Sequence, residues 1–405
     1  MPRNDAFDAF DAFDAFDAFD AFSAGGGNGG SGRLAEALTR SREGHLGRAG
    51  LAGVNAAAFE FKPRLLRNWS TPGNTTDGDG NEMPAPGPRW LARMDVRHRA
   101  QVCVLELMDP VRWRGPMANE SRTLDLGRGR AIEFRRPPRR AFMCQVDRVE
   151  SWAALRSERA PEILAQIAPQ LPFWSSVTRL DAAVMPYTVE LLGVAVECAS
   201  NVVQKVKFAM VCPRPSDYSP RIQAMLDVPG HFSWPSGHAT QAFMVAELLS
   251  SLTLPADTRR IAAWSEMRQQ LLRQAERIAT NRVVAGVHFP IDNDAGFQLG
   301  MRLAQVLVDS ATSAGDTRPV GALIGGSSLE PGEPTDSYRD PAAHVHDFSL
   351  DQTKLERSRH HKLTGASESE VQSTVPPVLV GDAIKTPIQW LWARAHSEWH
   401  DAGVL

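Results

Sequence analysis

The chain has 405 residues, of which 43% are hydrophobic and 22% are charged, and its formal net charge at pH 7 is −3. These values are typical of a globular protein with flexible additions, and the balanced charge gives no reason to expect a nucleic-acid partner. The four cysteines are widely spaced and form no CxxC pair, so neither a zinc site nor a redox motif is expected.

No membrane or export segment is expected from the sequence. The N-terminus lacks the basic and apolar regions of a secretory signal peptide. Glu190, Glu197 and Glu247 interrupt the longest apolar stretches, so none reaches the roughly 18 uncharged residues of a membrane span. We therefore expect a soluble protein, cytoplasmic or otherwise, without a transmembrane segment. The sequence does not indicate its oligomeric state.

Residues 1–88 are predicted to be a low-complexity, disordered tail with linkers. Six copies of Asp-Ala-Phe fill residues 5–22, and a period of three matches neither a helix nor a strand. A Gly-rich run at 25–32 and a Pro- and Gly-rich run at 70–88 are typical of linkers and turns. A sticky aromatic tail that recruits partners is the functional alternative to simple expansion of a coding repeat.

Residues 89–175 are expected to form the N-terminal part of the ordered domain, mixed or helical in structure. The apolar stretch AQVCVLELMDPVRWRG (100–115) contains Asp109-Pro110. It fits a strand or a short buried helix, and its periodicity does not distinguish the two.

Residues 176–312 are predicted to be the helical catalytic core. Apolar residues recur there at spacings of three and four, which is typical of amphipathic helices. The expected helices cover 189–211, 239–252, 258–287 and 292–311. The sequence thus predicts an all-α fold built on a helical bundle.

Residues 313–405 are expected to be flexible except for a Trp-rich helix at 386–400, which Pro387 suits at its first turn. This helix can dock its tryptophans on the core, and a lid over a site is the alternative. The loose histidine cluster is interpreted as surface residues, with adventitious metal binding as the alternative; its members are His344, His346, His360 and His361.

Three short segments contain residue types that bind a phosphate-like oxyanion. They are KFAMVCPRP (207–215), PSGH (235–238) and NRVVAGVHFPID (281–292). Fixed positive charge and N–H donors suit the oxygens of such an anion, and arginine binds them with two parallel hydrogen bonds. The candidate cations are Lys207, Arg214 and Arg282.

The PSGH segment places an anion site at the start of a helix. Free backbone N–H groups and the positive end of the helix dipole favour an anion there. Pro235 fixes the entry, Ser236 can cap the helix or bind an oxygen, and Gly237 lets the backbone approach a ligand. His238 follows in the first turn.

Two histidines can divide the work of hydrolysis between a nucleophile and an acid. His288 precedes Phe289-Pro290, so a helix should end close to it and expose its ring. Asp292 lies just beyond and can accept from one ring nitrogen, which leaves the other free to attack. A helix cap is the simpler role for Asp292, and the two roles are compatible.

In order and internal spacing these segments resemble the three-part signature of the phosphatidic acid phosphatase type 2 (PAP2) and vanadium haloperoxidase superfamily. Lys207 and Arg214 are separated by six residues, and Arg282, His288 and Asp292 follow one another after five and three residues. The resemblance covers residues 207–292. The surrounding stretch is more similar to soluble bacterial members than to the membrane lipid phosphatases.

The resemblance implies a helical bundle of the acid phosphatase and vanadium haloperoxidase type. It also implies a metal-independent phosphatase that needs no cofactor and hydrolyses phosphomonoesters or related small phosphoesters through a phosphohistidine. His288 would be the nucleophile, His238 the general acid and Asp292 the residue that orients the nucleophile. The implied oxyanion-binding residues are Lys207, Arg214, Ser236, Gly237 and Arg282.

Two other functions remain open. A vanadium-dependent haloperoxidase would hold vanadate on His288 in the same pocket, because vanadate mimics the phosphoryl transition state. Pro213 before Arg214 favours the phosphatase, since haloperoxidases more often have an aromatic residue there. An inactive scaffold is the third hypothesis, but every chemically required side chain is present. Asn281 replaces the family's usual serine, and we expect altered packing or a changed oxygen contact without loss of activity.

Overall fold

The structure, a computed structural model, describes residues 75–76, 82–83, 87–127, 129–167, 170–312, 321–324 and 374–403. The Asp-Ala-Phe repeat, the Gly-rich run and the four clustered histidines of the sequence analysis lie outside these residues. The chain divides into two compact units, Ala24–Arg93 and the remainder. The smaller unit contains the antiparallel strands β1 (Thr75–Thr76) and β2 (Glu82–Met83) and a 3₁₀ helix, η2 (Pro88–Arg93).

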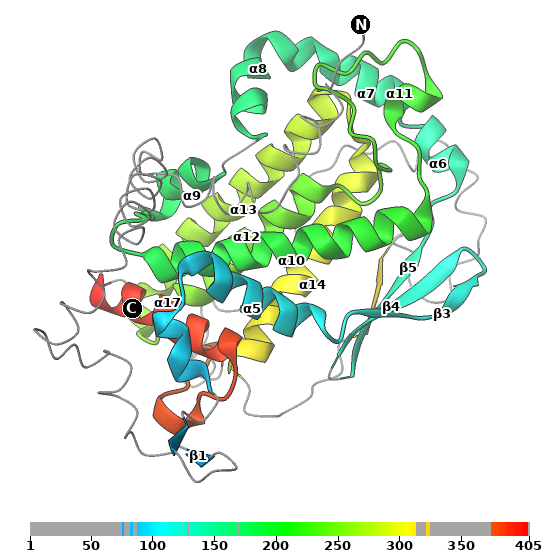
Figure 1. Cartoon of the computed structure of the whole chain (residues 1–405). Coiled ribbons are helices and arrows are strands. Elements are labelled where there is room, and N and C mark those ends of the chain that lie inside the picture. The colour runs from blue at the N-terminus through cyan, green and yellow to red at the C-terminus, as the bar shows by residue number, and fades with distance from the viewer. Residues whose placement is uncertain are drawn as a thin grey trace, which may run out of the picture. The chain divides into compact units, whose positions relative to one another are not determined.

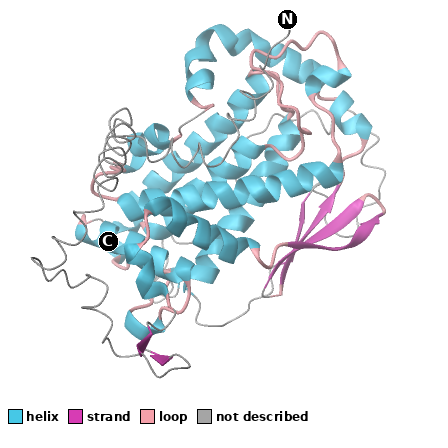
Figure 2. Ribbon diagram, in the orientation of Figure 1, coloured by secondary structure: helices cyan, strands magenta, loops and turns pink. Residues whose placement is uncertain are grey.

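Most of the larger unit is helical, as Figures 1 and 2 show. Its long helices are α5 (Val96–Met108), α10 (Pro186–Met210), α12 (Gly237–Leu252), α13 (Ile261–Val284), α14 (Pro290–Thr312) and α17 (Pro387–Asp401). Shorter helices connect them: α6 (Arg139–Met143), α7 (Val146–Trp152), η3 (Ala153–Leu155), α8 (Arg156–Ala165), α9 (Leu171–Thr178), α11 (Pro215–Tyr218), η4 (Thr258–Arg260) and η7 (Gly381–Ala383). The helices predicted over 189–211, 239–252, 258–287 and 292–311 are confirmed, with small shifts at their ends.

A small sheet makes the all-α prediction too narrow. Strands β3 (Arg112–Ala118), β4 (Ser121–Gly127) and β5 (Arg130–Arg135) pair antiparallel, and β6 (Gly321–Ile324) pairs parallel with β5. The ambiguous stretch 100–115 contains both structures that its pattern allowed, since α5 ends at Met108 and β3 begins at Arg112. Pro110, which lies between them, cannot continue a helix.

Helix α12 lies at the centre of the core and packs against α10, α13 and α14. All of its residues except Gly237 and Gln241 are buried. A helix that is apolar around most of its circumference is stable only when other elements cover every face. The charged side chain of Glu247 is tolerated because Arg268 of α13 donates to it over 3.2 Å.

Two glycines of α14 allow α12 and α14 to approach closely. A Cβ atom at Gly300 would lie 2.4 Å from the carbonyl oxygen of Thr240, and one at Gly296 would lie 2.8 Å from that of Ser236. Real Cβ atoms do not approach backbone atoms so closely, so a side chain at either position would separate the helices. The contact runs toward Ser236 and therefore sets the position of the PSGH segment relative to α14.

The C-terminal helix α17 docks on the core, as the first of its two predicted roles requires. Trp390, Trp392 and Trp399 are buried. The carboxylate of Glu398 also accepts hydrogen bonds from the backbone N–H groups of Tyr187 and Thr188, each over 2.8 Å. These N–H groups have no partner within α10 because they lie in its first turn. Helix α17 thus caps α10 from outside.

Within the part of the chain that the structure describes, no helix is both long and apolar enough to cross a membrane.

Substituting Gly300→Ala should lower the free energy of unfolding by about 1–3 kcal/mol, since the added methyl group meets the backbone of α12. Urea unfolding at pH 7 measures the change. Gln298→Ala, on the partly exposed side of α14, should stay within about 0.5 kcal/mol of the parent. A Gly300→Ala protein as stable as the parent would contradict the close approach.

Candidate active site

The ends of four helices bring the predicted site residues together. Lys207 lies in the last turn of α10 and Arg282 in the last turn of α13. Ser236 is the N-cap residue of α12, and Asp292 lies in the first turn of α14. Arg214 comes directly before α11, and His288 occupies the short connection between α13 and α14. Helix ends offer unpaired N–H and C=O groups, so they suit a polar site.

Asp292, four residues after His288, holds the His288 ring by a hydrogen bond. The Nδ1 atom of His288 lies 2.9 Å from Oδ2 of Asp292, and the backbone N–H of Phe289 donates to the same oxygen over 2.9 Å. Ser233 donates its hydroxyl to this oxygen too. When Nδ1 carries the proton that Asp292 accepts, Nε2 keeps its lone pair. The predicted relation between His288 and Asp292 is therefore present.

The connection before His288 is shaped by a glycine that no other residue could replace easily. Helix α13 ends at Val284, and Gly286 then adopts a φ of +80°. A Cβ atom at Gly286 would lie 2.6 Å from Nη2 of Arg156. Left-handed backbone and close contact both favour glycine at this position, and the turn carries the chain to His288.

Lys207 and Arg214 bind backbone carbonyls that border the two histidine segments. The Lys207 ammonium donates to Phe232 over 2.7 Å and to Ser233 over 2.8 Å. The Arg214 guanidinium donates to His231 over 3.0 Å through Nε and to Val287 over 2.7 Å through Nη1. These bonds tie the first segment to the residues that come shortly before PSGH and directly before His288.

The PSGH segment begins α12 as predicted. Ser236 caps the helix by accepting from the backbone of Ala239, and its own N–H donates to the Asp292 carbonyl over 2.9 Å. The peptide bond between Trp234 and Pro235 is cis. Ser236 therefore joins the second segment to the third through the backbone.

Arg282, Asn281 and His238 share one partner, Gln166. The side-chain oxygen of Gln166 accepts from Arg282 over 3.2 Å and from Asn281 over 3.0 Å. Its backbone carbonyl accepts a hydrogen bond from His238. Asn281 also accepts from Arg159 over 3.2 Å. The Asn281 amide therefore donates to one neighbour and accepts from another, Gln166 and Arg159.

Two functional candidates escaped the sequence analysis. Ser233 lies just before PSGH and belongs to none of the motifs. Gln166 lies 116 residues before Arg282 in the chain. No periodicity or motif in the sequence points to either residue. The Nδ1 atom of His231, which also precedes PSGH, lies 3.1 Å from Nη2 of Arg214.

Burial and nearby cations lower the pKa values of the histidines. For His288 burial has the largest effect, and the charges of Arg214 and Lys207 add to it, so its pKa lies well below the ordinary value. Burial likewise lowers the pKa of His238, and Arg282 adds to the effect. Both rings are therefore neutral at pH 7 in the unliganded protein.

Burial also shifts the pKa values of the acidic and basic side chains of the site. It raises the pKa of Asp292 to about 6, although Ser233 and Phe289 stabilise the carboxylate by hydrogen bonds. Burial lowers the pKa of Arg214 to about 10 and that of Arg282 to about 10. The pKa of Lys207 lies well below its ordinary value because of burial and then of Arg214.

The site residues are almost completely removed from solvent. Lys207, Arg214 and Arg282 are at most 3% exposed, and Asp292 is fully buried. Buried charges of one sign are costly unless partners neutralise them. Carbonyl groups of the chain and one carboxylate compensate part of this positive charge, so a bound anion would add stabilisation.

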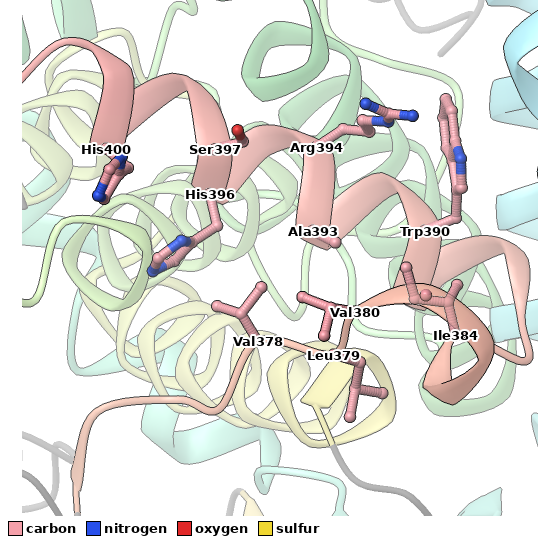
Figure 3. Close-up of a pocket in the computed structure, with 11 residues that line it drawn as sticks. Val378, Leu379, Val380, Ile384, Trp390, Ala393, Arg394, His396, Ser397 and His400 are labelled. Atoms are coloured by element: carbon pink, nitrogen blue, oxygen red, sulfur yellow. The ribbon is translucent and has the colours of Figure 1, made fainter.

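A separate pocket of about 380 Å³ lies beside α17 (Figure 3). Figure 3 shows the aliphatic side chains of Val378, Val380 and Ile384 on one side and side chains of α17 on the other. None of the predicted site residues lines it. The described residues contain no group of three or more His, Cys, Asp or Glu side chains arranged to hold a metal ion.

Lowering the pH from 7 to 5.5 should decrease the free energy of unfolding. The folded protein holds His238 and His288 neutral, whereas the unfolded chain binds protons on them below a pH of about 6.5. Each such histidine contributes a loss of up to about 1.4 kcal/mol per pH unit in this range. Asp292, whose pKa in the folded protein is about 6, binds a proton in the same range and offsets part of this loss.

Urea unfolding at several pH values measures this effect. His238→Gln removes one titrating group, so its free energy of unfolding should fall less steeply with pH than that of the parent. Equal slopes for the two proteins would show that His238 does not resist protonation in the folded state.

Comparison with known proteins identifies the region of the chain that contains the candidate site. No curated protein matches the chain. Residues 189–314 match the model of the PAP2 superfamily, and they contain Lys207, the PSGH segment and the His288 segment. The match indicates phosphatase-type hydrolysis of phosphoesters for this part of the chain.

Proposed function

We propose that the protein hydrolyses small phosphomonoesters through a phosphohistidine on His288, without a metal ion. The observation that carries the proposal is the arrangement of Lys207, Arg214 and Arg282. Lys207 and Arg214 act on the neutral ring of His288, whose Nδ1 atom faces a buried carboxylate, and Arg282 acts on the neutral ring of His238. A phosphoryl group supplies the negative charge that such a site requires.

His288 is the proposed nucleophile. Its low pKa keeps the ring neutral, so the lone pair of Nε2 is available at pH 7. As Nε2 bonds to phosphorus, the bond from phosphorus to the ester oxygen breaks and the ring becomes positively charged. Asp292 accepts the Nδ1 proton in a hydrogen bond over 2.9 Å and thereby stabilises this charge.

His238 is the proposed acid for the leaving oxygen. In the unliganded protein Arg282 contributes to its low pKa. A bound phosphoester dianion offsets this cation and raises the pKa, so the ring takes up a proton when substrate is present. In the second step His238 removes a proton from water, the water oxygen attacks phosphorus, and the bond to His288 breaks.

The phosphoryl oxygens are proposed to bind the three cations and the first turn of α12. Arg282 has a buried Nε–H without a hydrogen-bond partner among the described residues, and Lys207 uses two of its three N–H groups for carbonyls. At Gly237 a Cβ atom would meet Val203 at an ordinary 3.8 Å. Packing within the protein therefore leaves room for a side chain at residue 237. Close approach of an anion to the helix N-terminus, by contrast, requires glycine there.

The full-length protein should release phosphate from an aryl phosphomonoester in the presence of a chelator. His288→Ala should reduce kcat by at least about 10³-fold, because the nucleophile is removed. A phosphoryl adduct that survives base and is lost in acid should be trapped on the parent and be absent from His288→Ala.

His98→Ala is the matched control, since this histidine is exposed on α5 and contacts Asp95; its kcat should equal that of the parent. Absence of phosphate release by the parent would refute the proposal. Halide oxidation in the presence of vanadate and hydrogen peroxide would then identify the haloperoxidase alternative, which uses the same residues.

A further inference from the structure

The C-terminal turn of α8 contacts the candidate active site from outside the segment that matches the PAP2 superfamily. Residues 189–314 form that segment, and α8 ends at Ala165. The backbone carbonyl of Ile163 accepts from Nη2 of Arg282 over 3.0 Å. Carbonyls at the end of a helix lack intrahelical donors, so they are available to a cation.

Helix α8 is anchored firmly to α13. Arg156 donates to the carbonyl of Val284 over 2.8 Å. Arg277 donates to both carboxylate oxygens of Glu162, each over 2.8 Å. Ile163 is fully buried in a cluster with Val284. The helix therefore has a fixed position relative to the last turn of α13, where Arg282 lies.

The surrounding groups determine which way the Gln166 amide faces. Its Nε2 atom donates to Glu162 over 2.9 Å. Burial acts to raise the pKa of Glu162, but the hydrogen bonds and positive charges of its neighbours, Arg277 foremost, together outweigh it, and the pKa is lowered. A carboxylate only accepts, so the amide nitrogen of Gln166 must face it. The amide oxygen then faces Arg282 and Asn281.

We propose that Gln166 is a positioning residue that orients Arg282 for oxyanion binding. The inference rests on the proposed function, because it assigns to Arg282 a contact with a phosphoryl oxygen. Gln166 accepts from Nη2 of Arg282 over 3.2 Å and so directs the rest of the guanidinium, including the buried Nε–H, away from α8. Asn281 donates to the same oxygen over 3.0 Å and holds it in place.

Gln166 also contacts His238, the proposed acid. The Gln166 carbonyl accepts a hydrogen bond from His238, so its side chain aligns a cation and its backbone aligns the ring. A side-chain substitution affects only the first of these contacts. The test therefore concerns the binding of the oxyanion rather than the transfer of a proton.

Two substitutions separate positioning from a purely structural role. Gln166→Met keeps the length of the side chain and removes the strong acceptor. Gln166→Glu keeps an acceptor for Arg282 and Asn281, but its carboxylate would pair with Arg282 and compete with a bound anion. Both substitutions therefore weaken anion binding if Gln166 positions Arg282, whereas a purely structural role predicts a loss of stability with the parental affinity.

Calorimetric titration of the full-length protein with inorganic phosphate provides the measurement, with vanadate as a second ligand. Gln166→Met should raise the Kd for phosphate by at least about tenfold, the loss of one hydrogen bond to a charged group. Gln166→Glu should raise the Kd at least as much, because its carboxylate offsets the charge of Arg282, and thermal unfolding monitors the stability of each variant.

Gln389→Met is the matched control, because Gln389 is buried on α17 and accepts from Lys385 over 2.8 Å and from Thr386 over 3.2 Å. It should lose stability and keep the parental Kd. A parental Kd for Gln166→Met, or for Gln166→Glu, would overturn the inference.

The binding measurement also distinguishes this inference from the proposed function. A parent protein that binds phosphate without hydrolysing the ester would refute the function while weaker binding by the Gln166 variants still supports positioning. A parent protein that binds neither phosphate nor vanadate would overturn the positioning role, since Arg282 would then have no oxyanion to hold.

Discussion

The close approach of α12 and α14 is the constraint on which the candidate site depends. Gly296 and Gly300 leave no room for a side chain between the two helices. This contact brings the start of α12 beside the start of α14, where the Ser236 N–H donates to the Asp292 carbonyl over 2.9 Å. Two segments that carry a histidine each therefore meet at one end of the bundle, although 49 residues lie between His238 and His288. If the helices were farther apart, both segments could still form, but they would not share one ligand.

Buried positive charge connects the stability of the fold with the chemistry of the site. Lys207, Arg214 and Arg282 are removed from water, which costs free energy that backbone carbonyls and Asp292 offset only in part. The same cations lower the pKa values of the histidines. An unliganded protein thus keeps neutral rings beside fixed positive charge. A phosphoryl anion would relieve the repulsion and restore basicity to the proposed acid, so binding and proton uptake are expected to be coupled.

Elements outside the three motif segments hold those segments in place. Glu398 of α17 caps the first turn of α10, and α10 carries Lys207 in its last turn. The C-terminal turn of α8 holds Arg282 through Ile163 and Gln166. A site with a strong excess of one charge needs such support, because its own residues repel one another. Side chains that accept hydrogen bonds from the cations supply this support without cancelling their charge.

The sequence by itself determined the long helices of the core and the chemistry of the three segments. Apolar spacing is a local property, so it located α10, α12, α13 and α14. The His288-Phe289-Pro290 order marked a helix boundary correctly, but the ring that it was expected to expose is buried. Local patterns did not resolve 100–115, where a helix and a strand follow one another around Pro110. They did not reveal the sheet either, because β3 contains Gly115 and Pro116, which are unfavourable in strands, and β6 pairs with β5 from far along the chain. Only the tertiary structure decided that Gln166 and Ser233 contact Arg282 and Asp292. A glutamine or serine acquires such a role from its neighbours in space, and one chain's residue order does not contain that information.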